Sequence, residues 1–313
     1  MTIVTDTAPS NDPLWPRAAH WSVPAPAENP SCDIALLGVP AHRTSITPTG
    51  AHATPAAIRD ALSRYSTYAG SHRIDVAELT AMDFGDVAEP DGPEGEARVR
   101  TAISRAASSG AQLVIALGGD NSITCPVLEG FAGGSLAEWG LITIDAHHDL
   151  RDGITNGSPV RRLVEAGLPG RNIVQIGIAD FSNSAAYAAR AEEYGITVIH
   201  RSEVATRPLG AQLAYALDRA GAGGRRVFVD IDVDVCDRAE VPGCPSAAPG
   251  GLSARELREI TFTLACDPRV AGIDITEIDA TIDSADQRTV RLAALLVLEA
   301  AAGLSARRAT SPF

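Results

Sequence analysis

Concentrated positive charge is missing from this 313-residue sequence, which contains no lysine and has a formal net charge of −13. Every basic residue other than histidine is arginine, and the arginines form no basic cluster. Nucleic acids are bound through concentrated positive charge, because their phosphates must be neutralised. The sequence therefore argues against a nucleic-acid partner and favours a cationic or neutral small molecule, or another protein.

Cysteines are few and widely spaced. The five of them are odd in number and include no CxxC pair: Cys32, Cys125, Cys236, Cys244 and Cys266. A disulfide framework or a zinc knuckle would need paired, regularly spaced cysteines, so neither is indicated. The pattern fits a protein of the reducing cytoplasm.

A signal peptide and long apolar segments are also missing. The opening stretch MTIVTDTAPSNDPLWP has no positive segment followed by an apolar one, and no later run approaches about 18 uninterrupted apolar residues. We therefore expect a soluble protein with no membrane partner. With 45% hydrophobic residues, the chain can still build a sizeable core.

Short apolar runs alternate with helical patterns from Asp33 onward. We predict roughly eight strands, at residues 34–40, 79–87, 111–120, 141–146, 172–178, 196–200, 225–235 and 270–278. This alternation is typical of a mostly parallel α/β sheet covered by helices on both faces. No linker interrupts it, so residues 32–313 are predicted to form one domain behind an extended N-terminal arm, residues 1–31.

The segment TIDAHHDL, residues 143–150, places acidic and imidazole groups directly after an apolar strand. In an extended chain every second side chain points the same way, so Asp145, His147 and Asp149 are expected to converge. Ligands lie beyond the carboxyl ends of the strands in such sheets. Three converging ligands predict a metal site.

A second acidic segment, DIDVDVCD at residues 230–237, follows another predicted strand and places Asp230, Asp232 and Asp234 on one face. Buried carboxylates repel one another unless a cation compensates them. Carboxylates with one imidazole are a ligand set that suits Mn²⁺, whereas structural zinc sites are rich in thiolates. A pair of Mn²⁺ ions can activate a water molecule for hydrolysis. The alternative is that these acids are solvated loop residues or structural Ca²⁺ ligands.

Two weaker signals lie at other strand ends. In LGGDNS, residues 117–122, two glycines allow close backbone approach before Asp120 and Asn121. In ITEID, residues 275–279, Glu277 could anchor a cationic amidine or guanidine. Taken alone, the first is more often a simple turn and the second a solvated acid.

These motifs, GGDNS, DAHHD, DIDVDVCDRAEVPGCPSAAPGG and ITEID, closely resemble in order and spacing the arginase/agmatinase (ureohydrolase) family, over nearly all of the chain from about residue 33. The resemblance implies a three-layer α/β/α fold with an eight-stranded parallel sheet. It also implies two Mn²⁺ ions, attack of metal-bound hydroxide on an amidine or guanidine carbon, and a homo-oligomer, a trimer or hexamer. Asp149 and Glu277 are the implied catalytic residues, and the implied metal ligands are Asn121, Asp145, His147, Asp149, Asp232 and Asp234, with Asp145 and Asp232 bridging.

Two positions depart from the family pattern. Asn121 stands where the family has a metal-binding histidine, and because an amide oxygen is the weaker ligand we expect one metal to bind loosely. Asn156 stands where arginases and agmatinases have a proton-shuttling histidine. Formimidoylglutamases also lack that second histidine, and the segment DAHHDLRDG looks most like their actinobacterial members.

The resemblance to this branch implies hydrolysis of N-formimidoyl-L-glutamate to L-glutamate and formamide. Arg151 is expected to bind a substrate carboxylate in a bidentate manner. The implied substrate-binding residues are Arg151, Asn156, Ser158 and Glu277, and weaker candidates for a carboxylate are Arg43, Arg161 and Arg162. The alternatives are a guanidino hydrolase that releases urea and, from another class, a metal-poor binding protein without catalysis.

Overall fold

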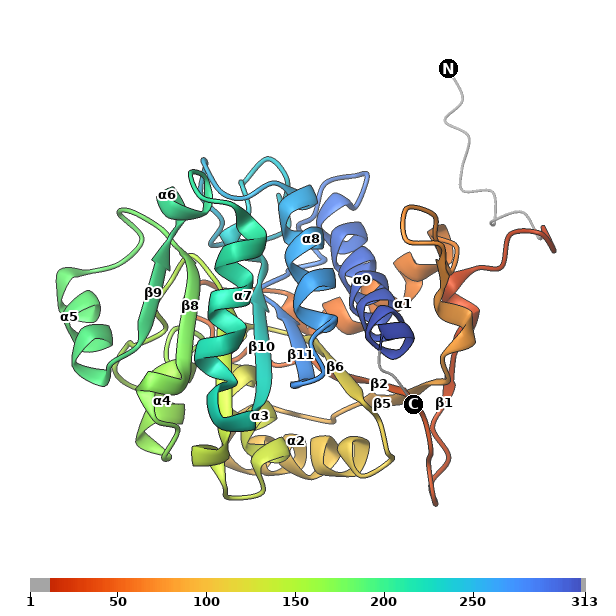
Figure 1. The fold of residues 1–313 in the computed structure, drawn as a ribbon, viewed down its shortest axis with the longest axis horizontal. Coiled ribbons are helices and arrows are strands. Elements are labelled where there is room, and N and C mark those ends of the chain that lie inside the picture. Colours follow the sequence, from red (N-terminus) through yellow and green to blue (C-terminus); the bar gives the residue numbers. More distant parts are fainter. Residues whose placement is uncertain (1–11, 311–313) are drawn as a thin grey trace.

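The structure is a computed structural model and describes residues 12–310. Within this part of the chain, nine strands form one sheet in which all neighbours are parallel (Figure 1). Their order across the sheet is β1 (Ser22–Pro24), β5 (Ala81–Asp86), β2 (Ile34–Val39), β6 (Leu113–Gly118), β11 (Val270–Thr276), β10 (Arg226–Asp232), β7 (Trp139–Ile144), β8 (Ile173–Ile178) and β9 (Thr197–His200). A small antiparallel pair, β3 (Tyr68–Ala69) and β4 (Ile74–Asp75), lies apart from it.

All eight predicted strands are present, and the ninth, β1, comes from the N-terminal arm, for which the sequence predicts no strand. Its residue Ser22 pairs with Ala81 of β5 at the edge of the sheet. β1 is short and largely exposed, so no apolar period marks it, and backbone pairing alone makes it a strand. Residues 1–11 of the predicted arm lie outside the described residues.

Helices cover both faces of the sheet, as expected, and give three layers (Figure 1). Side chains of β6 alternate between two cores, Leu113 and Ile115 facing one and Val114 and Ala116 the other. The first core is covered by α1 (Thr54–Ala61), α6 (Arg201–Val204), α7 (Leu209–Ala220), α8 (Ala254–Ala265) and α9 (Arg288–Thr310). The second is covered by α2 (Gly92–Ala107), α3 (Thr124–Ala132), α4 (Pro159–Glu165) and α5 (Ala185–Tyr194).

The C-terminal helix α9 is apolar because it lies in the first core. By length and composition its segment Arg288–Arg308 could cross a membrane. However, 67% of the apolar 18-residue stretch within this segment is buried inside the protein. Leu292, Leu296 and Leu304 are among its fully or almost fully buried residues. Packing against the sheet and α8 therefore accounts for its composition.

Because the strands are parallel, their carboxyl ends meet at one edge of the sheet. The loops after β2, β6, β7, β10 and β11 come close together at this edge. The glycines of LGGDNS are needed here: a Cβ on Gly119 would lie 2.2 Å from the carbonyl oxygen of Ala41. This edge is where the sequence places its candidate site.

Candidate metal centre and substrate pocket

A pocket of about 110 Å³ opens at the carboxyl edge of the sheet. Several residues singled out from the sequence line it, together with others that were not. The lining comprises Ile46, Thr47, His147, Asp149, Arg151, Asn156, Gly157, Asp232, Asp234, Ser246 and Glu277.

The acids after β7 converge through turns and not through strand alternation. β7 ends at Ile144, and Asp145 Oδ1 then accepts a hydrogen bond from the backbone N–H of His147 at 2.6 Å. Asp149 has left-handed backbone with φ +54°, an unusual conformation for a residue with a side chain. The extended geometry expected for residues 145–149 is therefore wrong, although Asp145 and His147 do come together.

The second acidic segment also turns as β10 ends. Asp232 Oδ1 accepts a hydrogen bond from the backbone N–H of Asp234 at 2.8 Å, which begins a short 3₁₀ turn. Asp232 and Asp234 both reach the pocket. Asp230 lies deeper, fully buried beside Asp274 of β11, and does not line the pocket.

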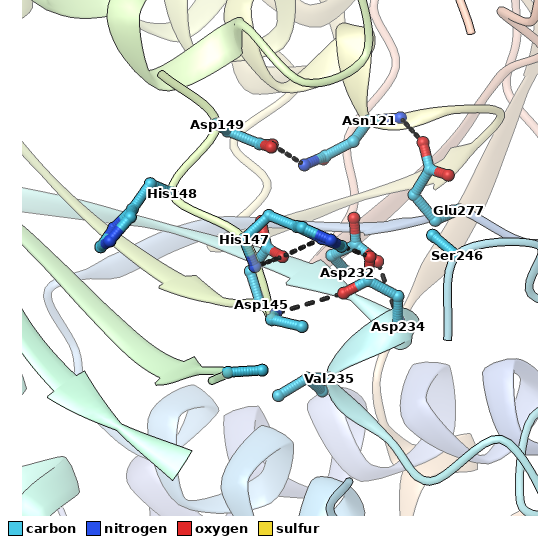
Figure 2. Close-up of polar contacts among 12 residues, drawn as sticks. Asn121, Asp145, His147, His148, Asp149, Asp232, Asp234, Val235, Ser246 and Glu277 are labelled. Atoms are coloured by element: carbon cyan, nitrogen blue, oxygen red, sulfur yellow. Dashed lines mark hydrogen bonds and ion pairs between the residues drawn. The ribbon is translucent and has the colours of Figure 1, made fainter. Parts of the chain in front are cut away.

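An imidazole joins the two segments (Figure 2). His147 Nδ1 lies 2.8 Å from Asp234 Oδ2 and 3.5 Å from Asp145 Oδ1. Asp234 Oδ1 also accepts a hydrogen bond from the backbone N–H of Ala146 at 3.2 Å. The loop after β7 is thus held against the end of β10.

Burial and mutual repulsion dominate the electrostatics of this cluster. Burial, reinforced by Asp149 and Asp234, raises the pKa of Asp145 well above its ordinary value, and burial with Asp234 and Asp145 does the same to Asp232. Burial raises the pKa of Asp149 to about 7. Burial would lower the pKa of His147, but the charges and hydrogen bonds of Asp234 and Asp145 together outweigh burial and raise this pKa to about 12. The cluster attracts positive charge.

The residues present fit a divalent cation. The possible ligand atoms of Asp145, His147 and Asp234 all lie within 4.8 Å of one another. Asp145 Oδ2 is buried and has no hydrogen-bond partner among the described residues. Carboxylate oxygens with one imidazole suit Mn²⁺, and a cation would relieve the repulsion that raises these pKa values.

Asn121 follows β6 and turns its amide nitrogen toward the acids (Figure 2). Its Nδ2 donates to Asp149 Oδ2 at 2.5 Å, whereas its Oδ1 accepts from the hydroxyls of Thr124 at 2.9 Å and Thr276 at 3.0 Å. Only the oxygen of an amide can bind a cation, because the nitrogen is a donor. In this arrangement Asn121 holds Asp149 and does not present a metal ligand.

Glu277 lies just past β11 on the other side of Asn121. Its backbone is left-handed, with φ +63°, and its Oε1 accepts from the backbone N–H of Asn121 and from Asn156 Nδ2, each at 2.8 Å. Burial, reinforced by Asp120, raises the pKa of Glu277 to about 8. Strained backbone at Glu277 and Asp149, on both sides of one pocket, is the kind of feature that is retained at functional sites.

Arg151 is the arginine of the pocket. Its stem lies against Gly157, where a Cβ would come within 2.7 Å of Arg151 Cδ. Among the described residues, no carboxylate lies within ion-pair distance of its guanidinium. A free guanidinium on a pocket wall can take a carboxylate from a ligand.

The other predicted substrate-side residues have structural partners. Ser158 is buried, and its hydroxyl donates to the carbonyl oxygen of Thr155 at 2.7 Å, which closes the loop that carries Arg151. Arg161 donates to the carbonyl oxygen of Arg151 at 2.7 Å, and Arg162 forms an ion pair with Glu96. Arg43 is exposed and outside the pocket lining. Arg151 therefore lines the pocket, and these residues do not.

Four lining residues are missing from the sequence-based candidates, and one of them, Gly157, lies against the stem of Arg151. Ile46 and Thr47 belong to the loop after β2, and no local pattern marks them. Ser246 falls within the quoted segment DIDVDVCDRAEVPGCPSAAPGG and lies beside Asp234 (Figure 2). Its place in that motif is a signal that could have identified it.

The sequence is similar to those of known enzymes. The sequence profile of the arginase family matches residues 32–303. The formimidoylglutamase of Halalkalibacterium halodurans is 38% identical over 271 residues, which cover 84% of this chain and 84% of that protein.

Solved structures agree. The crystal structure of formimidoylglutamase from Bacillus subtilis is similar with a TM-score of 0.88 at 30% identity, covering 100% of this chain and 98% of that one. The formiminoglutamase of Trypanosoma cruzi, solved with Mn²⁺, has a TM-score of 0.85 at 24% identity, covering 95% and 100% of the two chains. At this lower identity the likeness concerns the fold.

Proposed function

Because the chain belongs to the arginase family, we propose that it is a Mn²⁺-dependent hydrolase that converts N-formimidoyl-L-glutamate and water to L-glutamate and formamide. The observation that carries this choice is that Glu277 and the free guanidinium of Arg151 line the same pocket. Glu277 suits an amidinium, and Arg151 suits a carboxylate. A substrate with both groups matches the pocket.

Asp145, His147, Asp149, Asp232 and Asp234 would hold the metal. Two Mn²⁺ ions are part of the proposal, one of them held less firmly because Asn121 turns its oxygen away. When bound, Mn²⁺ supplies Lewis acidity and lowers the pKa of a coordinated water toward neutrality.

The protein's own groups bind and orient the substrate. Glu277 is buried, so an amidinium that pairs with it leaves the water. The attraction between the two charges is stronger in the protein interior than in water. Arg151 fixes the other end of the substrate through its carboxylate. Asp149, held by Asn121 on the metal side of the pocket, is the second catalytic carboxylate of the proposal. Binding both ends keeps the formimidoyl carbon near the metal ligands.

We expect purified, Mn²⁺-loaded protein to release glutamate from N-formimidoyl-L-glutamate, and a chelator to abolish this. Agmatine and guanidinobutyrate, run in parallel, test the alternative of a guanidino hydrolase, since Glu277 would also suit a guanidinium. Urea from either compound would keep the metal chemistry and overturn the substrate. If none of the three compounds is hydrolysed and the protein retains no Mn²⁺, the alternative of a non-catalytic binding protein is favoured.

We also propose how the chain is divided into domains and how it assembles. Residues 32–313 are taken as the single catalytic domain, and residues 1–31 as an arm that contributes β1 to the sheet. The protein is expected in the cytoplasm as a homo-oligomer, a trimer or hexamer, with no nucleic-acid or membrane partner. Light scattering on the purified protein tests the assembly.

A further inference from the structure

Three loops of the pocket meet at the side chain of Asn156. Its Nδ2 donates to Glu277 Oε1 at 2.8 Å, and its Oδ1 accepts from the backbone N–H of Ile46 at 3.0 Å. Its own backbone N–H donates to the carbonyl oxygen of Thr44 at 3.3 Å. Ile46 and Glu277, which lie 110 and 121 positions from Asn156 in the sequence, are thus joined through one amide.

The orientation of this amide is fixed by its partners. The carboxylate of Glu277 can only accept, and the backbone N–H of Ile46 can only donate, so a flipped Asn156 would lose both hydrogen bonds. The nitrogen of Asn156 therefore faces Glu277, and its oxygen faces the loop after β2.

The contact leaves one carboxylate oxygen of Glu277 available. Oε1 accepts from Asn156 and from the backbone of Asn121, whereas Oε2 has no hydrogen-bond donor among the described residues. Hydrogen bonds to one oxygen fix the plane of a carboxylate. Asn156 thus helps to determine where Oε2 points.

The same amide also holds the middle of the loop after β2, whose residues 44–47 form one wall of the pocket. The loop after β2 is held at one end by Asp91, which accepts from the backbone of Arg43 at 2.8 Å, and at the other by Asp279, which accepts from the backbone of Gly50 at 2.6 Å. Between these ends, Asn156 holds Ile46, next to Thr47 on the pocket lining.

We infer that Asn156 is a positioning residue that aligns Glu277 for the cationic end of the substrate and ties the wall formed by residues 44–47 to it. This inference rests on the proposed function. Asn156 acts through Glu277 and need not touch the reacting atoms. One side chain thereby links the placement of the wall to that of the carboxylate.

Two substitutions separate the two contacts. Asn156→Asp keeps an acceptor for the N–H of Ile46 but removes the donor to Glu277, whereas Asn156→Ala removes both. We expect both variants to raise KM for N-formimidoyl-L-glutamate about ten-fold or more, since a hydrogen bond to a charged group is lost. Hydrogen–deuterium exchange of the peptide containing residues 44–47 should quicken in Asn156→Ala and stay near wild type in Asn156→Asp.

A double-mutant cycle shows whether Asn156 acts through Glu277. KM for the same substrate is measured with Mn²⁺-loaded protein by steady-state kinetics, with Asn156→Ala tested in the wild type and in Glu277→Gln. We expect the roughly ten-fold rise in KM to disappear largely in the Glu277→Gln background. An equal rise in both backgrounds, or unchanged exchange in Asn156→Ala, overturns the inference.

Asn172→Ala is the matched control. Asn172 is also a buried asparagine, but its amide donates to the carbonyl oxygen of Trp139 at the start of β7, away from the pocket. We expect it to lower stability and leave KM unchanged. If the wild type hydrolyses a guanidino compound and not the formimidoyl substrate, the proposed function fails; the cycle is then run with that compound, and the exchange measurement needs no substrate.

Discussion

The two sides of the pocket are built on different principles. On the metal side, Asp145, Asp232 and Asp234 crowd together, and Asp145 Oδ2 lacks a hydrogen-bond partner among the described residues. On the substrate side, Glu277 Oε1 is matched by neutral N–H donors from Asn121 and Asn156. The first side needs a cation to be complete, whereas the second is arranged by the chain itself.

The difference has an energetic consequence. Buried carboxylates that repel one another destabilise the metal-free fold, so metal binding should also stabilise it. A ligand that binds only the folded state adds about 4 kcal/mol when its concentration is roughly a thousand times its Kd. Variants that affect one side should therefore change metal-linked stability, and those that affect the other should change substrate binding.

The largest expected effect comes from the metal side. Asp145→Asn removes one charge from the cluster, and loss of several kcal/mol of metal assistance corresponds to about a thousand-fold or greater fall in kcat/KM. Because repulsion is relieved, the metal-free variant should melt at a higher temperature than the metal-free wild type. Calorimetric melting with and without Mn²⁺ checks this, with Asp218→Asn, an exposed acid, as control. Equal stability gains from Mn²⁺ in variant and wild type would contradict it.

A smaller effect is expected on the substrate side. Arg151→Ala should raise KM for the formimidoyl substrate about ten- to a hundred-fold, because a charged hydrogen bond is removed, with little change in the stability gained from Mn²⁺. Gly157→Ala should act in the same direction, since its Cβ would lie 2.7 Å from Arg151 Cδ. Steady-state kinetics measures both. An unchanged KM in Arg151→Ala would remove this residue from substrate binding.

Asn121 lies between the two sides and should show a mixed response. Asn121→His offers an imidazole in place of an amide whose oxygen is turned away, so Mn²⁺ affinity should rise about ten-fold. The hydrogen bond to Asp149 would be altered at the same time. Metal titration by calorimetry gives the affinity and the number of ions. Unchanged affinity and number would mean that position 121 does not reach the metal.

Much of the fold was predictable because buried parallel strands are continuous apolar runs, as in β6 and β7. β1 was not, since its exposed residues carry no pattern and only pairing with β5 makes it a strand. Short polar edge strands depend on tertiary contacts that a local window does not contain.

The candidate site was predictable in its composition and not in its geometry. Acids at strand ends identified Asp145 and Asp232, but turns set their directions. The orientation of Asn121 depends on Thr276, which is 155 positions away, and the wall at Ile46 depends on Asn156, 110 positions away. Such hydrogen bonds are decided by the fold, so no spacing within a motif contains them.

The metal side should also give a dependence of stability on pH whose sign differs with and without metal. Burial raises the pKa of Asp149 to about 7 and of Glu277 to about 8, whereas unfolded carboxyl groups titrate near about 4. Between these values the folded, metal-free protein binds more protons than the unfolded chain. Its free energy of unfolding should therefore fall as the pH rises from about 5 to about 8.

The remaining groups of the cluster do not reverse this trend. The raised pKa of His147 stabilises the folded state below about 6.5 and loses that contribution as pH rises toward about 12, which adds to the fall. The lowered pKa of Asp234 matters only under more acidic conditions. With Mn²⁺ the ligands must be deprotonated, so the slope should turn upward, each proton contributing about 1.4 kcal/mol per pH unit. Urea unfolding at several pH values, with chelator and with Mn²⁺, measures both slopes; slopes of the same sign would mean that the carboxylate cluster is not the metal site.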